Sequence, residues 1–245
     1  MKNYIKYFLQ RILGINRYLF IFSRFKIHSL KYDKKEKDFF HFLSLLSNKN
    51  GDILDIGANI GIMSYHLAKR FPKNNIHAFE PIPCNLKVLK RIKERYNLNK
   101  VIIHSFALGN STESIEMILP KEKGAIQQGL SHVKHKDISE WNNGEQIQVE
   151  QKKLDDIFKE KQIDGIKIDV ENYEYLTLKG AEKVIKKNLP IIYCELWDNE
   201  NRVKCFDFMK SIEYEIYVLF NKQLCVFDAS KHEKQNFFFL PKSRQ

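Results

Sequence analysis

The 245-residue chain is 43% hydrophobic, which is enough to bury a sizeable core. Its four cysteines have no CxxC or metal-ligand spacing, so we expect reduced thiols, no structural zinc and a cytoplasmic location. No apolar run approaches the roughly 20 residues of a membrane span, and Arg11 interrupts the first apolar segment, so neither a spanning helix nor a signal peptide is expected.

The basic character of the chain is concentrated at its N-terminus. Residues 1–50 hold eleven Lys and Arg but only three acids. Aromatic side chains are interleaved with these cations at Tyr4, Tyr7, Phe8, Tyr18, Phe20, Phe22 and Phe25. Two interpretations stay open: a helix that packs its aromatic side on the main domain, or an interfacial helix that contacts anionic lipid through residues 1–30. Nucleic-acid binding is not expected, because no reading motif accompanies the charge.

We therefore expect residues 1–48 to form a basic, aromatic, helical extension and residues 49–245 to form the main domain. Within this domain, strand-like apolar runs are found at 52–57, 75–80, 100–104, 165–170 and 190–195. Helix-like stretches alternate with them at 61–72, 84–97, 173–187 and 201–211. This alternation predicts an α/β fold with a doubly wound, mostly parallel sheet.

Two further regions complete the expected domain. The segments 214–220, 223–227 and 236–241 are strand-rich without intervening helices, which predicts an antiparallel C-terminal edge. The polar stretch 120–145 has no clear period, and we expect a loop or short helices that lie over the sheet.

Ligands of such sheets bind at the carboxyl ends of the strands. The first strand runs through Asp55 into the Gly57–Gly61 turn, and the second ends at Glu80-Pro81, where an acid can accept hydrogen bonds from both ribose hydroxyls. A dinucleotide fingerprint would have glycine in place of Asn59, and no GK[ST] phosphate loop follows. The pattern favours a nucleoside cofactor without phosphate.

Four stretches carry a resemblance to a known family: GDILDIGANIG (51–61), HAFEPIPCNLKVLKRI (77–92), SFALGN (105–110), and DGIKIDVENYEYLTLKGA (164–181) followed by PIIYCEL (190–196). Over about residues 51–241 the chain resembles the FkbM-type S-adenosylmethionine-dependent methyltransferases. The family usually has glycine after IDVE, where this chain has Asn172, a residue type that tolerates a left-handed backbone. The resemblance implies a seven-stranded, Rossmann-like methyltransferase sheet and methylation of an oxygen, often on a sugar or secondary metabolite.

The resemblance also implies roles for individual residues. The methionine part of the cofactor would lie against small residues of the first turn, namely Gly57, Ala58, Asn59 and Gly61, which would make room against bare backbone. Asp55 would support this turn, and Glu80, followed by Pro81, would bind the ribose. Phe106 and Ala107 would flank the adenine. Asp169 would face both the sulfonium and the incoming hydroxyl.

A hydroxyl acceptor has to lose its proton, which a positioned carboxylate can take. Asp169 and Glu171 end the fourth strand and Glu195 ends the fifth, so three acids can converge on one crevice, with Lys167 on the strand face of Asp169. Other interpretations stay open: Asp169 or Glu171 can cap the following helix, and Glu195 can orient a neighbouring helix. The three acids can also hold Mg²⁺, an alternative to which we do not commit.

The histidines give a weaker signal. His132 and His135 can supply a base or hold a substrate, but surface positions are the commoner case, and His77 and His104 are expected to lie in the core.

Two alternative functions remain at this point: a nicotinamide-dependent oxidoreductase, and a non-catalytic nucleoside-binding scaffold recruited to a membrane. For the acceptor we expect a small molecule or a glycan. A lipid-linked or nucleotide-linked glycan at the inner membrane face is a hypothesis that the charge placement motivates.

Overall fold

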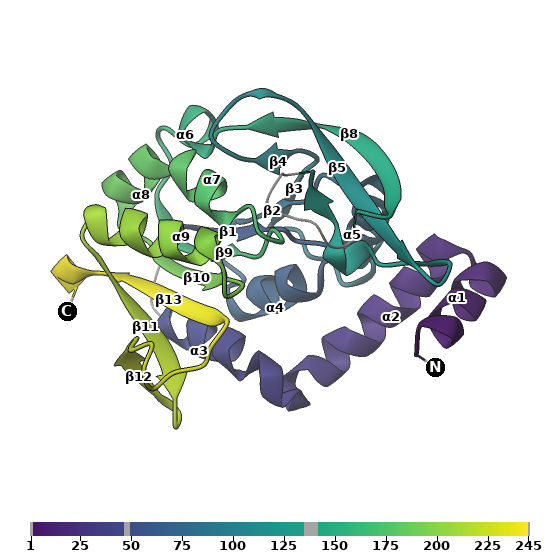
Figure 1. Cartoon of the computed structure of the whole chain (residues 1–245), viewed down its shortest axis with the longest axis horizontal. Coiled ribbons are helices and arrows are strands. Elements are labelled where there is room, and N and C mark those ends of the chain that lie inside the picture. The colour runs from purple at the N-terminus through teal and green to yellow at the C-terminus, as the bar shows by residue number, and fades with distance from the viewer. Residues whose placement is uncertain (1, 47–49, 135–141, 245) are drawn as a thin grey trace.

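The structure is a computed structural model that describes residues 2–46, 50–134 and 142–244, with an α/β architecture (Figure 1). The α-helices are α1 (Lys2–Leu13), α2 (Ile15–Ser29), α3 (Lys37–Leu45), α4 (Ile62–Arg70), α5 (Pro83–Arg95), α6 (Leu154–Ile157), α7 (Glu174–Lys179), α8 (Glu182–Asn188) and α9 (Glu200–Ser211). The 3₁₀ turns are η1 (Leu30–Tyr32), η2 (Lys34–Glu36), η3 (Gln128–Leu130) and η4 (Lys242–Arg244).

The strands form two sheets. The main sheet contains β1 (Asp52–Ile56), β2 (Ile76–Phe79), β3 (Val101–His104), β9 (Ile163–Ile168), β10 (Ile191–Glu195), β11 (Tyr214–Phe220), β12 (Gln223–Val226) and β13 (Asn236–Pro241). The smaller sheet contains β4 (Ala107–Leu108), β5 (Glu113–Glu122), β6 (Ala125–Ile126), β7 (His132–Val133) and β8 (Gly144–Lys152).

The main sheet has the order β12-β11-β13-β10-β9-β1-β2-β3. Strands β3, β2, β1, β9 and β10 pair in parallel, whereas β13 is antiparallel to both β10 and β11. The expected doubly wound, mostly parallel sheet with an antiparallel C-terminal edge is therefore confirmed. The hairpin strand β12 pairs with the outer side of β11 and brings the sheet to eight strands.

Helices cover both faces of this sheet (Figure 1). Because successive strand residues point to opposite faces, Ile53 packs with the cluster under α2, α3, α4 and α5, while Leu54 and Ile56 pack with the cluster under α8 and α9. In the same way, Phe237 and Phe239 of β13 pack in the cluster under α8 and α9, whereas Phe238 packs in the cluster on the opposite face.

One predicted helix is interrupted. The stretch 173–187 was expected to be continuous, but α7 ends at Lys179 and α8 begins at Glu182. A Cβ on Gly180 would lie 1.8 Å from the carbonyl oxygen of Gly109, so the chain at Gly180 touches the backbone that follows β4. This close approach ends the first helix, and hydrophobic spacing along the sequence does not report it.

The expectation of a loop or short helices at 120–145 holds for η3 but is wrong where β5, β6, β7 and β8 enter the stretch; residues 135–141 lie outside the described residues. The second half of β5 and the start of β8 pair as antiparallel strands, with Pro120 opposite Gly144. A proline inside the segment and the short alternation at Ile147 and Val149 gave a weak strand signal. Together these strands cross over the carboxyl ends of the main sheet (Figure 1).

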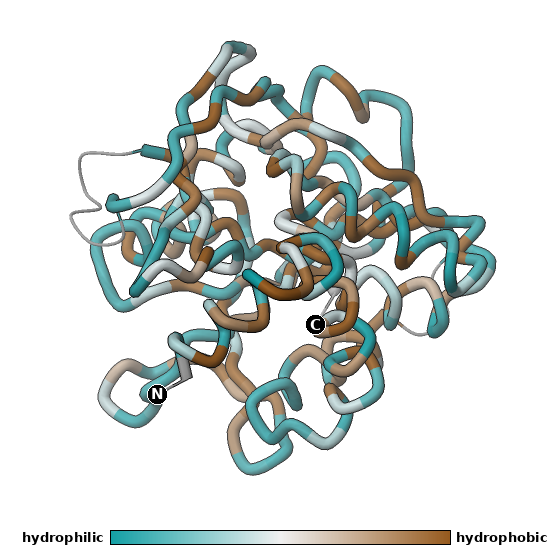
Figure 2. The backbone as a smooth tube through the Cα atoms, turned by 90° about the vertical axis from the view of Figure 1, so that its right-hand side faces the viewer, coloured by the Kyte–Doolittle hydropathy of each residue, from teal (hydrophilic) through white to brown (hydrophobic). Residues whose placement is uncertain are grey.

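The N-terminal helices pack on the same core as the main sheet. Leu19, Ile27 and Phe42 share a buried cluster with Ile53 and Val101. Figure 2 shows hydrophobic and hydrophilic residues alternating along these helices, as expected for segments with one packed side. None of the helices in the described ranges has both the length and the apolarity that crossing a bilayer requires.

Candidate active site

The turn after β1 is shaped by contacts within the chain. Gly57 has φ of 76°, and a Cβ there would lie 1.8 Å from the carbonyl oxygen of Asp169. Gly61 caps α4 with φ of 82°, and its Cβ would lie 2.6 Å from Leu89. The glycines therefore let β9 and α5 approach the turn; that the small residues of the turn also make room for a cofactor stays a prediction. Gly61 lines neither of the cavities described below.

A buried carboxylate lies beside this turn. Glu80 follows β2 and is 4% exposed. It accepts hydrogen bonds from the backbone N–H groups of Asn59 (2.8 Å) and Ile82 (2.8 Å) and from Asn85 Nδ2 (3.3 Å). Burial raises the pKa of Glu80 to about 7, although these donors favour its ionised form. The carboxylate is held in place, and Oε2, which accepts only one of these bonds, keeps a lone pair for a further donor.

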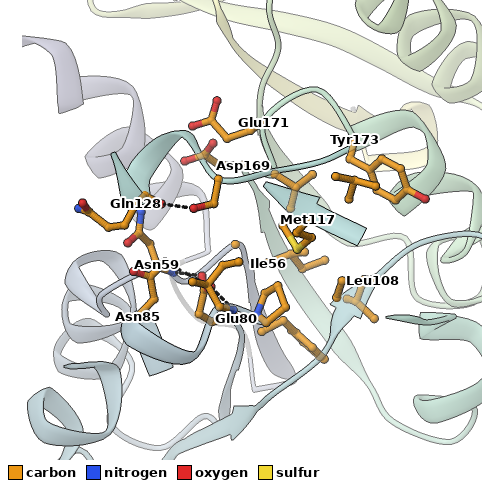
Figure 3. A pocket seen from close by; sticks show the side chains of 18 of the residues that line it. Ile56, Asn59, Glu80, Asn85, Leu108, Met117, Gln128, Asp169, Glu171 and Tyr173 are labelled. Atoms are coloured by element: carbon orange, nitrogen blue, oxygen red, sulfur yellow. Dashed lines mark hydrogen bonds between the residues drawn. The ribbon is translucent and has the colours of Figure 1, made fainter. Parts of the chain in front are cut away.

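Glu80 lines a cavity of about 610 Å³ that we call the nucleoside pocket (Figure 3). Its wall contains five residues that the sequence predicted as cofactor contacts next to Glu80, namely Gly57, Asn59, Pro81, Phe106 and Ala107. Ala58 lines the neighbouring cavity instead. Asp55 lies beneath the turn, where it accepts a hydrogen bond from Ser64 Oγ (2.5 Å), as its supporting role requires.

Lys167 places a positive charge under the site. Lys167 is 3% exposed. Its Nζ lies 3.4 Å from Asp55 Oδ1 and 3.7 Å from Asp169 Oδ2. The same Nζ donates a hydrogen bond to the carbonyl oxygen of Gly57 (2.9 Å). Burial alone would lower the pKa of Lys167, but Asp169 and Asp55 outweigh it and raise that pKa. The buried lysine is therefore charged and paired, as expected from its register with Asp169.

The three predicted acids do not share one cavity. Asp169 and Glu171 line the nucleoside pocket, whereas Glu195 opens on a separate cleft that contains Lys34 and Arg202. Burial, reinforced by Asp169 and Glu195, raises the pKa of Glu171 well above its ordinary value, and burial next to Asp169 raises that of Glu195. The expected convergence therefore holds for two of the acids, while the third acts on them through its charge.

The loop after β9 is fixed by a residue that the sequence did not single out. Glu174, at the start of α7, accepts hydrogen bonds from the backbone of Val170 (3.2 Å) and Asn172 (3.1 Å) and from Asn201 Nδ2 (2.6 Å). Glu171 and Asn172 adopt positive φ values of 53° and 72°, so the left-handed conformation anticipated for Asn172 is present. Glu174 thus holds the loop between β9 and α7, and α7 begins after Tyr173 without a side-chain cap hydrogen bond, so neither Asp169 nor Glu171 caps it.

Other lining residues were also missed. Met117, Gln128 and Val133 come from the small sheet and its turn, and Tyr173 and Asn85 come from the main domain. The first three fall in or near the stretch interpreted as a loop, so no strand-end argument could find them. Asn85 lies within the family-like stretch 77–92, which was the available signal.

The histidines are mostly internal. His77 is 2% exposed, and its ring nitrogens lie 2.9 Å from His104 Nε2 and 2.9 Å from Asp52 Oδ2, which agrees with its expected core position. His104, on the edge strand β3, is only half-buried. His132 is 1% exposed and contacts the carbonyl oxygen of Leu130, so the expectation of a surface histidine was wrong. His135 lies outside the described residues. In the described ranges, no three His, Cys, Asp or Glu side chains are arranged to hold a metal ion.

Comparison with known proteins adds sequence relatives. Residues 55–222 match the model of the methyltransferase FkbM domain family. The chain is 26% identical over 162 residues to Methyltransferase 1 of Beauveria bassiana, covering 60% of this chain and 65% of that protein. It is also 26% identical over 174 residues to Methyltransferase sdnD of Sordaria araneosa, covering 61% of this chain and 67% of that protein. The chain thus spans about two thirds of the length of these relatives.

A solved structure agrees in fold. The methyltransferase FkbM from Methylobacillus flagellatus superposes with a TM-score of 0.53 at 17% identity, covering 78% of this chain and 43% of that one. The family match covers more than half of the chain and includes the β1 turn, Glu80 and Asp169. This chain belongs to the methyltransferase FkbM domain family.

Proposed function

We propose that the protein transfers a methyl group from S-adenosylmethionine to a hydroxyl oxygen of an acceptor. The observation that carries this proposal is the buried carboxylate of Glu80 in a pocket that also contains the β1 turn and Asp169. The pocket suits a nucleoside: Glu80 Oε2, which accepts one backbone hydrogen bond, keeps acceptor capacity for a ribose hydroxyl, and Phe106 offers an aromatic wall. Buried Asn59 Oδ1, which has no hydrogen-bond partner among the described residues, is available to a donor on the ligand.

The residues around Asp169 suit proton removal from a hydroxyl. When bound, S-adenosylmethionine supplies a methyl group on a sulfonium; transfer forms an oxygen–carbon bond, breaks the carbon–sulfur bond and returns that electron pair to sulfur. Asp169 accepts the hydroxyl proton, and its Oδ2 lies 3.7 Å from Lys167 Nζ, which faces the carboxylate with a positive charge. Burial and the neighbouring carboxylates raise the pKa of Glu171, which favours a role as hydrogen-bond donor over that of a second base.

Calorimetry with two variants tests the proposal. Glu80→Gln should weaken S-adenosylmethionine binding by about 10–100-fold, since it replaces a charged acceptor. Asp169→Asn should leave that affinity nearly unchanged and lower kcat by about 10²–10⁴-fold, since only proton transfer is lost. Turnover is read as a methyl-sized mass gain on candidate glycans. A wild-type protein that binds NAD but not S-adenosylmethionine would favour the oxidoreductase alternative and overturn the proposal.

The pH dependence of cofactor affinity gives a second readout. Ribose hydroxyls donate to the ionised carboxylate, whereas burial raises the pKa of Glu80 to about 7. Affinity should therefore fall as the pH drops below about 7, because a proton then has to leave Glu80 on binding. In Glu80→Gln the same titration should be flatter.

We also propose that α1 contacts an anionic membrane surface. Nine of the exposed large hydrophobic side chains of the described residues lie between residues 4 and 32. Tyr4, Phe8 and Ile12 are each 60–62% exposed and, at i, i+4 and i+8, follow one face of α1. Lys and Arg side chains are interspersed with this face, a combination that suits an anionic interface.

Vesicle sedimentation tests this second proposal. Phe8→Asp together with Ile12→Asp should abolish binding of the full chain to phosphatidylserine-containing vesicles, because both changes put charge on the apolar face. Val203→Asp is a matched control, since Val203 is also an exposed apolar residue (56%) but lies on α9. Equal binding by wild type and the double variant would refute the membrane contact.

A further inference from the structure

A second cavity adjoins the nucleoside pocket. This cavity, which we call the N-terminal cleft, has a volume of about 1140 Å³ and lies between α1, α2 and η2 on one side and the β1 turn on the other. Both cavities are lined by the same five residues, namely Gly57, Asn59, Gln128, Gly129 and Asp169. The two spaces therefore meet at Asp169, the point where a donor in one and an acceptor in the other would come together.

The segment after β6 brings unpaired amide groups to this junction. Gln127 and Gln128 are 9% and 7% exposed, and both line the N-terminal cleft. Gln127 Oε1 accepts a hydrogen bond from Lys6 Nζ (2.7 Å), which leaves Gln127 Nε2 buried without a partner among the described residues. Gln128 Oε1 is likewise buried and unpaired in the described structure. In Figure 3 the Gln128 side chain extends toward the N-terminal helices and away from Glu80.

Buried polar atoms without partners are uncommon in native proteins, because each costs the free energy of its lost hydration. Here a buried donor and a buried acceptor come from consecutive residues and line the same cleft. A ligand that satisfies both atoms has to accept a hydrogen bond from Gln127 Nε2 and donate one to Gln128 Oε1. Neighbouring hydroxyls on a ring can do both, because each hydroxyl is a donor and an acceptor.

The opposite wall of the cleft is aromatic. Tyr18 and Phe22 lie one helical turn apart on α2 with nearly parallel rings (6.2 Å between centroids, 11° between planes), and both line the cleft. A mostly apolar face opposed by a few polar groups that fix orientation is the usual build of a small-molecule site. These aromatic residues lie outside the region 55–222 that matches the family, so this wall is particular to the extension.

We propose that the N-terminal cleft is the acceptor site, and that Gln127 and Gln128 bind the hydroxyls of a sugar ring whose reacting oxygen faces Asp169. The ring packs on Tyr18 and Phe22, so the N-terminal extension determines which acceptor is methylated. This proposal rests on the proposed methyl transfer for the role of Asp169, and on the cleft alone for the sugar site.

Ligand-detected saturation-transfer NMR on the full chain tests the sugar site. The probes are the methyl glycosides of glucose, galactose, mannose, fucose and rhamnose, measured with and without S-adenosylhomocysteine. At least one should bind wild type, and Gln128→Ala should weaken it by about tenfold, the cost of one good hydrogen bond. Because Gln128 Oε1 is unpaired, the variant should keep the wild-type melting temperature. Gln146→Ala, at an exposed position of β8, is the matched control.

The outcomes separate the two proposals. If no glycoside binds, or if Gln128→Ala leaves glycoside affinity unchanged, the sugar site is wrong. If Gln128→Ala weakens S-adenosylhomocysteine as much as the glycoside, the amides serve the cofactor and the assignment of the cleft fails. If a glycoside binds in a Gln128-dependent way while S-adenosylhomocysteine does not bind at all, the proposed methyl transfer fails and the sugar site stands.

Discussion

At the scale of single residues, Gly57 combines two constraints. Its φ of 76° is accessible to glycine at little cost, and the carbonyl oxygen of Asp169 occupies the place where a Cβ would lie. The second constraint comes from a strand more than a hundred residues later in the chain. Any side chain at this position would therefore push the end of β9, and Asp169 with it, away from the turn.

Gly57→Ala should destabilise the fold by about 2–4 kcal/mol, measured as the free energy of unfolding in urea. Gly14→Ala is a matched control: Gly14 has a similar φ of 71°, but no described atom lies within 4 Å of its Cβ position. We expect the control to cost less, about 1–3 kcal/mol, the backbone strain of a side chain at φ 71° and ψ 150° without any close contact. Equal losses in the two variants would show that the contact with Asp169 contributes nothing.

At the scale of elements, α1 is tied to the edge of the small sheet. Gln10 donates from Nε2 to the carbonyl oxygen of Ile126 (3.0 Å) and accepts at Oε1 from the N–H of Ile126 (2.9 Å). Gln10 therefore pairs with β6 as a further strand would. This pair and the bond between Lys6 and Gln127 join the extension to the segment that carries the amides of the N-terminal cleft.

Gln10→Ala removes both of these hydrogen bonds. The amide of Ile126 should exchange with solvent at least about tenfold faster, since it loses its acceptor. Amides of the central strand β1 should keep their protection, because they are hydrogen-bonded within the main sheet to β2 and β9. Hydrogen exchange followed by NMR gives both rates, and unchanged exchange at Ile126 would refute the tie.

At the scale of the whole molecule, the two faces of the main sheet have separate hydrophobic clusters, and the strands between them also carry titratable side chains. His77 and His104 lie next to each other on β2 and β3, stacked at 5.2 Å between ring centroids. Burial lowers the pKa of both histidines. The pKa of His104 falls to about 4, with His77 and Lys161 adding to the effect of burial. At His77 the nearby Asp52 opposes the effect of burial. Folding thus favours the uncharged rings.

This arrangement predicts how stability depends on pH. Because the pKa of His104 is lower in the folded state than in the unfolded state, the unfolded chain binds more protons between about pH 6.5 and 4. The stability contributed by neutral His104 is fully present above about pH 6.5 and is lost as the pH falls toward 4. The difference in unfolding free energy between wild type and His104→Phe should therefore decrease over that range. A difference independent of pH would contradict the assignment.

Much of the fold could be predicted from the sequence, because hydrophobic periodicity and strand-end glycines are local signals. The five parallel strands and α4, α5 and α9 lie within two residues of the predicted ranges. The break at Gly180 could not be predicted, since it depends on contact with Gly109, and neither could the β5–β8 pair, which is stabilised by long-range pairing.

For the candidate site, the sequence by itself determined the residues at the strand ends, since strand ends carry the recognisable motifs: Glu80, Asp169 and the turn at Gly57. Only the tertiary structure decided that Glu195 opens on a different cleft, that Glu174 holds the loop after β9, and that Gln127 and Gln128 lie beside Tyr18. The physical reason is that each of these facts depends on packing between distant segments, which alternation and spacing within one segment do not encode.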